Sequence, residues 1–193
     1  LGTVFFCSLI GYGLAKFDFP VRDLLFSFIL GTMMVPGQLT LIGLYVVVKE
    51  LGWLNTWQGL IIPEMIHAFG IFLMRQSLLA IPDELLDAGR VDGAGEFRIF
   101  AQIVLPLIRP STATLAILSF TGYWDSFLWP LIIITERLRY TLPVGLRYFL
   151  SDHGSYYNDL MTGSLLALLP VLVVFFVFQR HFIRGVISSG LKQ

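Results

Sequence analysis

Residues 81–110 read IPDELLDAGRVDGAGEFRIFAQIVLPLIRP and form a polar segment within an apolar sequence. This polar segment holds five of the chain's 13 acidic residues, which are Asp83, Glu84, Asp87, Asp92 and Glu96. Pro82 followed by two acids is typical of a helix start, because proline fits the first helical position and acidic side chains complement the helix dipole. The pattern predicts a helix from Pro82 to Val91 or Asp92.

A corner and a second helix are predicted after it. Gly93 can adopt the left-handed conformation that commonly ends a helix. Apolar side chains then recur at the three- and four-residue spacing of one helical face, at Phe97, Phe100, Ile103 and Leu107. Pro106 and Pro110 are expected to end that stretch. The polar segment is therefore predicted to be a short helix, a glycine corner and a second short helix at a membrane surface, in contact with a soluble partner.

The composition around this segment is that of a membrane protein. Hydrophobic residues make up 56% of the 193 residues and charged residues 13%, whereas soluble domains average about 25% charged residues. The mean hydropathy is +0.78. The net charge is zero, so nothing indicates a nucleic-acid partner.

Five apolar stretches are long enough, or nearly so, to cross the roughly 20-residue thickness of a bilayer core. They are Leu1–Ala15, Leu24–Val48, Gln58–Met74, Pro110–Thr135 and Leu160–Gln179. The predicted fold class is an all-α polytopic membrane protein, with one transmembrane domain over residues 1–193. The first stretch is short and begins with Leu rather than Met, so we expect an N-terminal portion, and with it a sixth span, to be missing.

The distribution of basic residues predicts the orientation. One side of the five spans collects Lys16, Arg22, Arg75, Arg90, Arg98, Arg109, Arg180, Arg184 and Lys192. The other side has Lys49, Arg137, Arg139 and Arg147. Since basic residues concentrate in cytoplasmic loops, the polar segment and the C-terminus are predicted to be cytoplasmic, and the loops 50–57 and 136–159 to face outward.

The polar segment resembles the EAA loop of permease subunits in bacterial and archaeal ATP-binding-cassette importers. That pattern is Glu-Ala-Ala, three residues, Gly, and about a dozen residues later an apolar-Leu-Pro. Here it reads Asp87-Ala88-Gly89, then Asp92-Gly93-Ala94, then Val104-Leu105-Pro106. Asp87 stands where the family usually has Glu, and Gly89 where it has Ala.

Four further stretches narrow the resemblance to maltose-type, carbohydrate-uptake permeases. They are residues 51–56 (LGWLNT), 123–130 (YWDSFLWP), 140–146 (YTLPVGL) and the tail 184–192. The resemblance implies a multi-pass protein of the cell (inner) membrane that imports a sugar or oligosaccharide delivered by an extracytoplasmic binding protein.

The resemblance also implies that the polar segment docks on a separate ATPase. The residues implied to couple transport to ATP hydrolysis are Glu84, Asp87, Ala88, Gly89, Asp92, Gly93 and Ala94. The implied partners are a second homologous permease, two ATP-binding-cassette ATPase subunits and the sugar-binding protein. The sequence contains no G-x-x-x-x-G-K-[ST] phosphate loop, so we expect ATP and Mg²⁺ on the ATPase subunits. The chain itself is expected to hold no cofactor or metal and to be no enzyme.

Polar residues within the apolar stretches are candidates for the substrate pathway, because a charge inside the bilayer usually faces a cavity or a partner. They are Gln38, Glu64, His67, Trp124, Asp125 and Trp129. Asp125 between two tryptophans is typical of a sugar contact, since carboxylates bind hydroxyl groups and aromatic rings stack on sugar faces. The alternative is a buried Asp125 bonded to Ser126, Tyr123 or another helix. Glu64 and His67 are predicted to share one helical face, and Pro36, Pro63, Pro130 and Pro170 to interrupt spans.

Other functions stay open at this point. The same machinery could carry a polyol or glycerol phosphate. A secondary transporter driven by protons through Glu64, His67 and Asp125 would leave the polar segment unexplained. An intramembrane hydrolase would require a second catalytic carboxylate beside Asp125.

Overall fold

The computed structural model describes residues 1–151 and 154–190, and gives side chains for these residues except Tyr148, Ser151, 154–155 and 179–190. The residues group into two compact units, which we describe one at a time. Unit 1 comprises residues 1–36, 65–116 and 180–193, and unit 2 comprises residues 37–64 and 117–179. The tail residues 184–192, which contribute to the resemblance, lie outside the described side chains. The predicted single domain stays a prediction.

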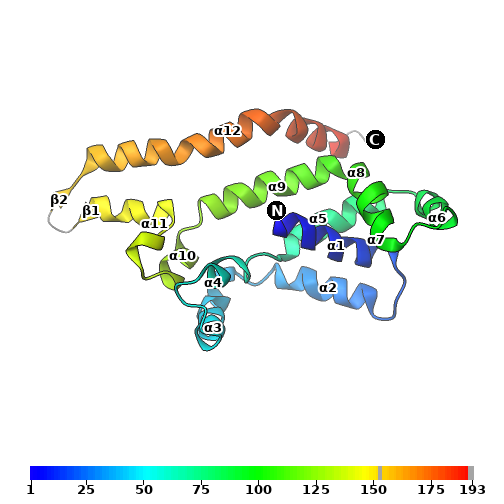
Figure 1. Ribbon diagram of the computed structural model, residues 1–193, viewed down its shortest axis with the longest axis horizontal. Helices are drawn as coiled ribbons and strands as arrows, with labels where there is room; N and C mark the ends of the chain where they lie inside the picture. Colours follow the sequence, from blue (N-terminus) through cyan, green and yellow to red (C-terminus); the bar gives the residue numbers. More distant parts are fainter. Residues whose placement is uncertain (152–153, 191–193) are drawn as a thin grey trace. The chain divides into compact units, whose positions relative to one another are not determined.

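Unit 1 is built mainly from short helices (Figure 1). They are α1 (Gly2–Lys16), α2 (Arg22–Thr32), α5 (Ala68–Leu79), α6 (Asp83–Val91), α7 (Glu96–Ile99), the π-helical turn η1 (Phe100–Val104) and α8 (Leu105–Leu107). The first part of α9 (Arg109–Trp124) and the last part of α12 (Tyr157–Gly190) also belong to it.

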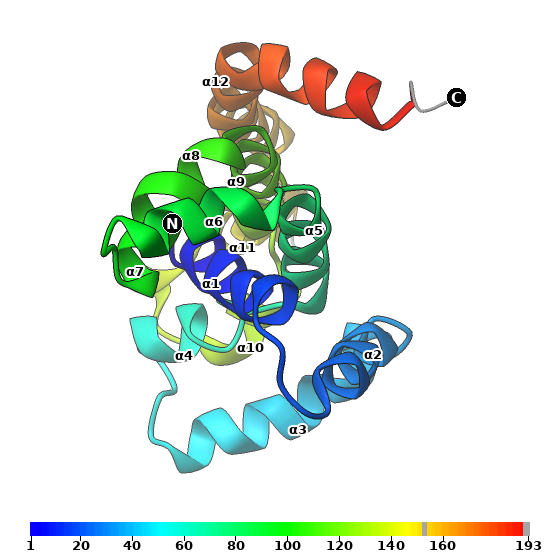
Figure 2. The ribbon, with the colours of Figure 1, turned by 90° about the vertical axis from the view of Figure 1, so that its right-hand side faces the viewer.

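Close packing of α1 against α5 forms the centre of unit 1, and the two helices lie side by side in both ribbon views (Figures 1 and 2). A Cβ atom at Gly11 would lie 2.9 Å from the Cβ of Met74, and one at Gly70 would lie 2.7 Å from the Sγ of Cys7. Glycine at both positions lets the two backbones approach, as is common between helices in membranes. The buried core continues from this contact into α6 and η1 through Leu86 and other apolar side chains.

Unit 2 contains the remaining elements. They are α3 (Gly37–Glu50), α4 (Trp57–Ile61), α10 (Leu128–Ile133), η2 (Arg137–Arg139), α11 (Leu142–Leu146), η3 (Arg147–Phe149), β1 (Leu150–Ser151) and β2 (Gly154–Ser155), with parts of α9 and α12. The two strands form a small antiparallel hairpin in which Leu150 lies opposite Ser155. A compact core of Val48, Trp129, Ile133 and Ile134 joins α3 to α10.

The all-α class is confirmed, but several predicted spans are not continuous helices. Among the described residues, one helix stretch, Tyr157–Phe178, is both long and apolar enough to cross a membrane, and two pairs of consecutive helices would raise the number to three if each pair were one bent span. Leu24–Val48 is divided between α2 and α3, Gln58–Met74 between α4 and α5, and Pro110–Thr135 between α9 and α10. The prediction that prolines interrupt the spans explains part of this difference.

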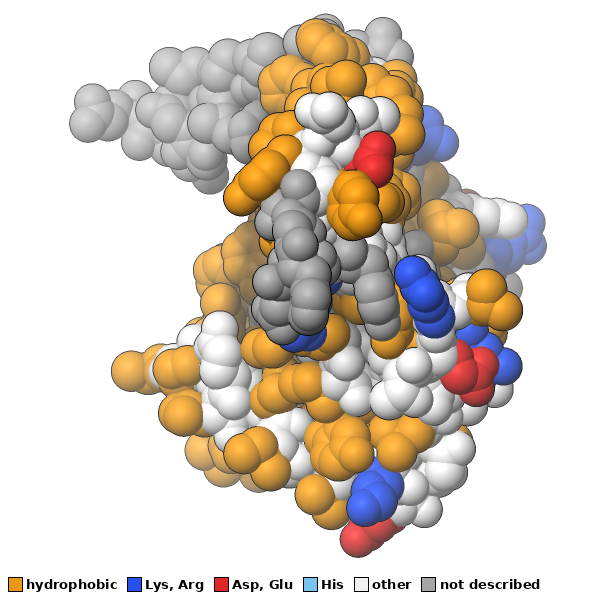
Figure 3. Space-filling view, turned by 90° about the vertical axis from the view of Figure 1, so that its left-hand side faces the viewer, with side chains coloured by type: hydrophobic (Ala, Val, Ile, Leu, Met, Phe, Trp, Pro, Cys, Tyr) orange, Lys and Arg blue, Asp and Glu red, His pale blue; other side chains and the backbone are white. Residues whose placement is uncertain are grey.

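Pro36 and Pro63 lie in the non-helical breaks before α3 and before α5. This is expected, because proline removes a backbone donor and clashes with the preceding turn. Pro130 instead lies inside α10, after a break at residues 125–127, and Pro170 lies inside α12 without ending it. On the face drawn in Figure 3, many hydrophobic side chains lie at the described surface, among polar and charged ones.

Candidate functional site

The helix at the start of the polar segment begins one residue after the predicted start and ends where predicted. α6 runs from Asp83 to Val91, Pro82 lies at its N-cap, and Asp83 and Glu84 occupy its first turn. Arg90 lies in the last turn, where a cation complements the helix dipole. The prediction of a short, dipole-matched helix is confirmed.

The glycine corner is also confirmed, and its hydrogen bonds explain why glycine is needed. Gly93 has φ +79°, in the left-handed region. Its N–H donates to the carbonyl of Arg90 at 3.0 Å, and the N–H of Ala94 donates to the carbonyl of Gly89 at 3.0 Å. These two bonds form a Schellman motif, which satisfies the last carbonyl groups of a helix. The corner is therefore a fixed turn with its backbone groups paired.

The buried face of α6 holds it against the following turns. Leu86 is 1% exposed, and Gly89 is buried beneath the side chains of Ile99 and Ile103. The helix after the corner differs from the prediction, because it consists of α7, a π-helical turn and α8 rather than one regular helix. Pro106 and Pro110 both lie near the starts of new helices, where proline is tolerated, and the break falls between them at Ile108.

The opposite face of α6 is exposed and mixed in character. Glu84, Asp87, Ala88 and Asp92 are exposed. Leu85 and Val91 are 45% and 87% exposed, and Phe97 beyond the corner is 65% exposed. Apolar side chains exposed beside acids on a short rigid helix are suited to a protein partner.

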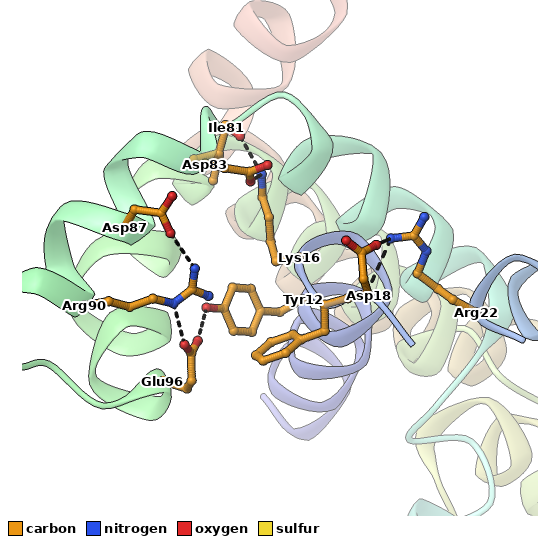
Figure 4. Close-up of polar contacts among 10 residues, drawn as sticks. Tyr12, Lys16, Asp18, Arg22, Ile81, Asp83, Asp87, Arg90 and Glu96 are labelled. Carbon is orange, nitrogen blue, oxygen red and sulfur yellow. Dashed lines mark hydrogen bonds and ion pairs between the residues drawn. The ribbon is translucent and has the colours of Figure 1, made fainter. Parts of the chain in front are cut away.

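A chain of ion pairs crosses the corner (Figure 4). Arg90 donates to Asp87 at 2.7 Å and to Glu96 at 2.7 Å. Hydrogen bonding to Glu96 and Asp87 raises the pKa of the Arg90 guanidinium, and the same bond from Arg90 lowers the pKa of Glu96. Asp87, predicted to meet a basic group of a partner, thus also pairs with a basic group of its own helix. Its side chain is 64% exposed, so one carboxylate can serve both contacts.

Two side chains of α1 bind the polar segment (Figure 4). The hydroxyl of Tyr12 donates to Glu96 Oε2 at 2.9 Å. The Nζ of Lys16 donates to the carbonyl of Ile81 at 2.5 Å and to Asp83 Oδ1 at 2.6 Å. The hydrogen bond and charge of Lys16 lower the pKa of Asp83. Neither role was predicted from the sequence, although Tyr12 and Lys16 lie one turn apart at the end of a span, a spacing that places them on one helical face.

The candidates around Asp125 separate into three environments, all within unit 2. Trp124 ends α9, and its indole Nε1 donates to the carbonyl of Ala167 in α12 at 2.9 Å. Trp129 is 4% exposed within the core, and its Nε1 has no hydrogen-bond partner among the described residues. Asp125 is exposed in the break between α9 and α10, and its carboxylate bonds to no group that the structure describes. The predicted pathway role of the three residues remains a prediction, and the alternative of a buried, bonded Asp125 does not match its exposure.

Glu64 and His67 do not share a helical face, because Pro63 lies in the break between α4 and α5. Glu64 lies in that break, and its carbonyl accepts a hydrogen bond from the hydroxyl of Tyr123. His67 is the N-cap of α5, where its Nδ1 accepts from the N–H of Gly70 at 3.0 Å. Gln38 is exposed in the first turn of α3.

A further residue that the sequence analysis missed is Asn55, in the connection between α3 and α4. Its Oδ1 accepts from the backbone N–H groups of Thr135 and Glu136 at 2.6 and 3.1 Å, and its Nδ2 donates to Thr135 Oγ1 at 2.8 Å. Asn55 has φ +57°, a conformation that asparagine tolerates better than most residues. Nothing local in LGWLNT indicates a partner 80 residues away.

A cavity of about 480 Å³ lies in the loop region of unit 2. It is lined by Arg137, Tyr140, Thr141, Leu142, Gly145, Phe149, Tyr156 and Asp159. Aromatic rings and both signs of charge therefore line an opening in the loop region that the sequence places outside the membrane.

Comparison with known proteins gives a consistent result. The profile of the family described as "Binding-protein-dependent transport system inner membrane component" matches residues 8–188. The chain is 40% identical over 190 residues to the arabinooligosaccharides transport system permease protein AraQ of Bacillus subtilis (strain 168), covering 98% of this chain and 68% of AraQ.

Two other relatives are 36% identical. One is the sn-glycerol-3-phosphate transport system permease protein UgpE of Yersinia pestis, with 98% of this chain and 68% of UgpE covered. The other is the lactose transport system permease protein LacG of Rhizobium radiobacter, with 97% and 68% covered. Among solved structures, a chain of a bacterial ABC transporter involved in the import of the acidic polysaccharide alginate matches with a TM-score of 0.77 at 24% identity, over 93% of this chain and 73% of that one. This last likeness concerns the fold.

Proposed function

The chain belongs to the family of binding-protein-dependent transport system inner membrane components, and we propose that it forms part of the path by which an ATP-driven importer carries a sugar or oligosaccharide into the cell. It is a permease of the ABC-transporter type, like the relatives that it matches. The family is one of transport subunits rather than enzymes.

The proposed substrate class rests on the names of the relatives. AraQ and LacG are named for arabinooligosaccharides and lactose. UgpE, named for sn-glycerol-3-phosphate, is 36% identical. Glycerol phosphate, or another polyol derivative, is therefore the second candidate solute for the same machinery.

Helix breaks support a substrate path close to Asp125. Non-helical backbone at membrane depth is tolerated where it is covered by protein or lines a cavity. The break at residues 125–127 leaves the Asp125 carboxylate exposed, and the hydroxyl of Tyr123 joins the end of α9 to the break at Glu64. We propose that sugar hydroxyl groups bind at these breaks, with Asp125 as the charged contact.

The observation that carries the mechanical part of the proposal is α6 with its Schellman corner. A short helix that is anchored by Leu86 and Gly89 on one face and exposed on the other can transmit a push from a partner to the spans. We propose that this face docks on one of two ATPase subunits, which bind ATP and Mg²⁺ and lie with the polar segment and the C-terminus on the cytoplasmic side. A second homologous permease completes the path, and the outward loops around Trp53 and Tyr156 receive the sugar-binding protein.

The test uses the complete transporter in lipid vesicles, with its partner permease and ATPase. ATP hydrolysis is measured with and without the sugar-loaded binding protein, and we expect stimulation by the loaded protein. Hydrolysis that ignores the binding protein would contradict the proposal. Transport that collapses with the proton gradient while ATP remains would instead favour proton coupling through Glu64, His67 and Asp125.

The docking face is tested by Asp87→Lys. This change puts a second positive charge beside Arg90 and reverses the charge offered to the ATPase, so co-purification of the ATPase should weaken. The matched control is Glu50→Lys, which makes the same charge reversal at an exposed residue of α3 and should leave co-purification unchanged. Equal co-purification of both variants would exclude a charged contact at Asp87.

A further inference from the structure

The two ends of α6 are held by the same face of the same helix. Tyr12 and Lys16 are one turn apart on α1, so their side chains project from one face. Lys16 binds the residues that precede and begin α6, and Tyr12 binds Glu96, which follows the corner at its other end (Figure 4). α1 therefore holds α6 at both ends.

The contact at the start of α6 is buried on the side of α1. The Lys16 side chain is 4% exposed, and its ammonium group meets the Ile81 carbonyl and the Asp83 carboxylate. Removing one partner of a buried charge leaves the other uncompensated. Movement of the start of α6 away from α1 would therefore leave the Lys16 ammonium group without these two acceptors.

The contact beyond the corner joins several groups. Tyr12 is 3% exposed, its ring centroid lies 5.3 Å from that of Phe100, and its hydroxyl reaches Glu96. Glu96 is in turn bound by Arg90 of α6. The corner, α6 and α1 are thus linked through one carboxylate.

α1 in turn is packed on α5 without space for sliding. The close approaches at Gly11 and Gly70 fix the two backbones against each other. At the end of the pair, the Arg75 guanidinium donates to the Leu14 carbonyl at 3.1 Å and lies 4.0 Å from the ring centroid of Phe26 in α2. A displacement of α1 is therefore passed to two neighbouring helices.

From these contacts we infer that α1 is the helix through which the polar segment moves the spans, and that Tyr12 and Lys16 are the positioning residues that make α1 and α6 move as one body. This inference rests on the proposed function, because it assigns the route by which ATPase movement reaches the membrane. It predicts that the distance between α1 and α6 stays constant during transport, while other distances change.

The experiment measures distances between pairs of spin labels in the complete transporter, in the nucleotide-free state and in a state trapped with ATP and the sugar-loaded binding protein. The first pair is Gly13→Cys with Gly95→Cys, which lies directly after the corner that ends α6. An added Cβ at Gly13 or at Gly95 meets no atom within 4 Å, and neither residue belongs to the proposed docking face, so both positions accept a label. The second pair is Gly13→Cys with Leu138→Cys, because Leu138 in η2 is fully exposed and belongs to unit 2.

We expect the first distance to be the same in both states and the second to change. A change in both distances would overturn the inference but leave the proposed function intact. No change in the second distance would mean that ATP does not drive a rearrangement, which contradicts the proposed function itself.

Variants of the two positioning residues supply an independent test. In Tyr12→Phe and Lys16→Met, the first distance should become broadly distributed, and sugar transported per ATP hydrolysed should fall by at least about tenfold, which is the lower end of the effect of losing one hydrogen bond to a charged group. Lys16→Arg, which retains the charge, should keep most of the coupling. A fall in transport and hydrolysis together would indicate a merely structural role and overturn the assignment.

The matched controls are Tyr45→Phe and Lys49→Met on α3. The hydroxyl of Tyr45 and the ammonium of Lys49 form no hydrogen bond or ion pair within the described part of the chain. Transport per ATP should be unchanged in both. A fall equal to that of Tyr12→Phe and Lys16→Met would show that the effect is not specific to α1.

Discussion

The polar segment (residues 81–110) and the outer turn (residues 51–56) are both connections held in place by residues distant in sequence. The polar segment is held by charged groups, through Lys16 to Asp83 and through Arg90 and Tyr12 to Glu96. The outer turn is held mainly by the neutral side chain of Asn55, and the Asn55 backbone adds a bond to the Ile133 carbonyl and accepts one from the Arg139 guanidinium. Ion pairs weaken as salt rises and are lost when their carboxylates are protonated, whereas the hydrogen bonds of a neutral amide do not depend on protonation. The two regions are therefore expected to respond differently to pH.

Asn55 should be the most costly residue to change in either region. Asn55→Ala leaves the N–H groups of Thr135 and Glu136 without their acceptor, and an unpaired donor costs about 1–3 kcal/mol when buried. Since Asn55 is half-buried, we expect the free energy of unfolding to fall by about 2 kcal/mol, which lowers the Tm by about 4–8 °C for a chain of this size. Differential scanning fluorimetry of the complete transporter measures the shift.

Asn55→Asp is the matched variant, because its carboxylate keeps the acceptor and the residue tolerates positive φ. We expect the free energy of unfolding to fall less than half as much in Asn55→Asp as in Asn55→Ala. Equal losses would mean that the acceptor of Asn55 does not fasten the outer turn.

Gly93→Val tests whether the polar segment has a geometric requirement of its own. A β-branched residue at φ +79° costs at least about 1–2 kcal/mol, so the corner should open while the protein still inserts. ATP hydrolysis stimulated by the binding protein should then fall without a matching loss of protein in the membrane. Gly95→Val is the control, because Gly95 has φ −70° and open space around its Cβ position. Normal stimulation of ATP hydrolysis in the Gly93 variant would show that transport does not depend on the corner.

The local parts of the polar segment were predictable from sequence, and the long-range parts were not. Pro82, the acids after it and Gly93 are sufficient to define α6 and its corner, because helix caps depend on neighbouring residues. The partners of Asp83 and Glu96 lie on α1, 67 and 84 residues away in sequence. Their pairing depends on how α1 packs, which no local pattern states.

The apolar stretches show the limit of reasoning from composition. Leu24–Val48 and Pro110–Thr135 are apolar enough to span a membrane, but each is two helices. Hydropathy measures the cost of burial and not the continuity of the helix, so it did not separate Pro63, which lies in a break, from Pro170, which lies inside α12. The prediction that Glu64 and His67 share one helical face was wrong for the same reason, because the apolar stretch that holds them is broken between α4 and α5.

Acid should loosen the polar segment before the outer turn. The hydrogen bonds from Lys16 and Arg90 lower the pKa values of Asp83 and Glu96 from their ordinary values of 3.8 and 4.5. A lowered folded-state pKa means that the unfolded chain binds the proton more readily, so this stabilisation is complete above the ordinary values and is lost as pH falls through the lower folded ones. The Asn55 amide does not titrate in this range.

Spin-label distances at pH 7, 5 and 3 measure this difference. The pair Gly13–Gly95 should be unchanged between pH 7 and 5 and broaden towards pH 3. The pair Trp57–Leu138, whose exposed residues lie on either side of the Asn55 contacts, should keep its width. Broadening of both pairs together would mean that acid acts on the whole protein rather than on the ion pairs.

The smallest change in Tm is expected for Gly89→Ala. The atom nearest to an added Cβ is a movable side-chain methyl at Gly89, but a backbone oxygen at Gly59 near the outer turn. A Cβ at Gly89 would lie 2.8 Å from the terminal methyl of Ile103, a flexible group, whereas one at Gly59 near the outer turn would lie 2.3 Å from the backbone oxygen of Trp53. Gly89→Ala gains up to about 1 kcal/mol in helix propensity and loses a similar amount as Ile103 shifts, so its Tm should change by no more than about 2 °C. Gly59→Ala forces backbone movement and should lower the Tm several times further in the same fluorimetric measurement. If Gly89→Ala lowers the Tm as much as Gly59→Ala does, the Ile103 side chain beneath α6 cannot shift, and the expected difference between a side-chain and a backbone neighbour fails.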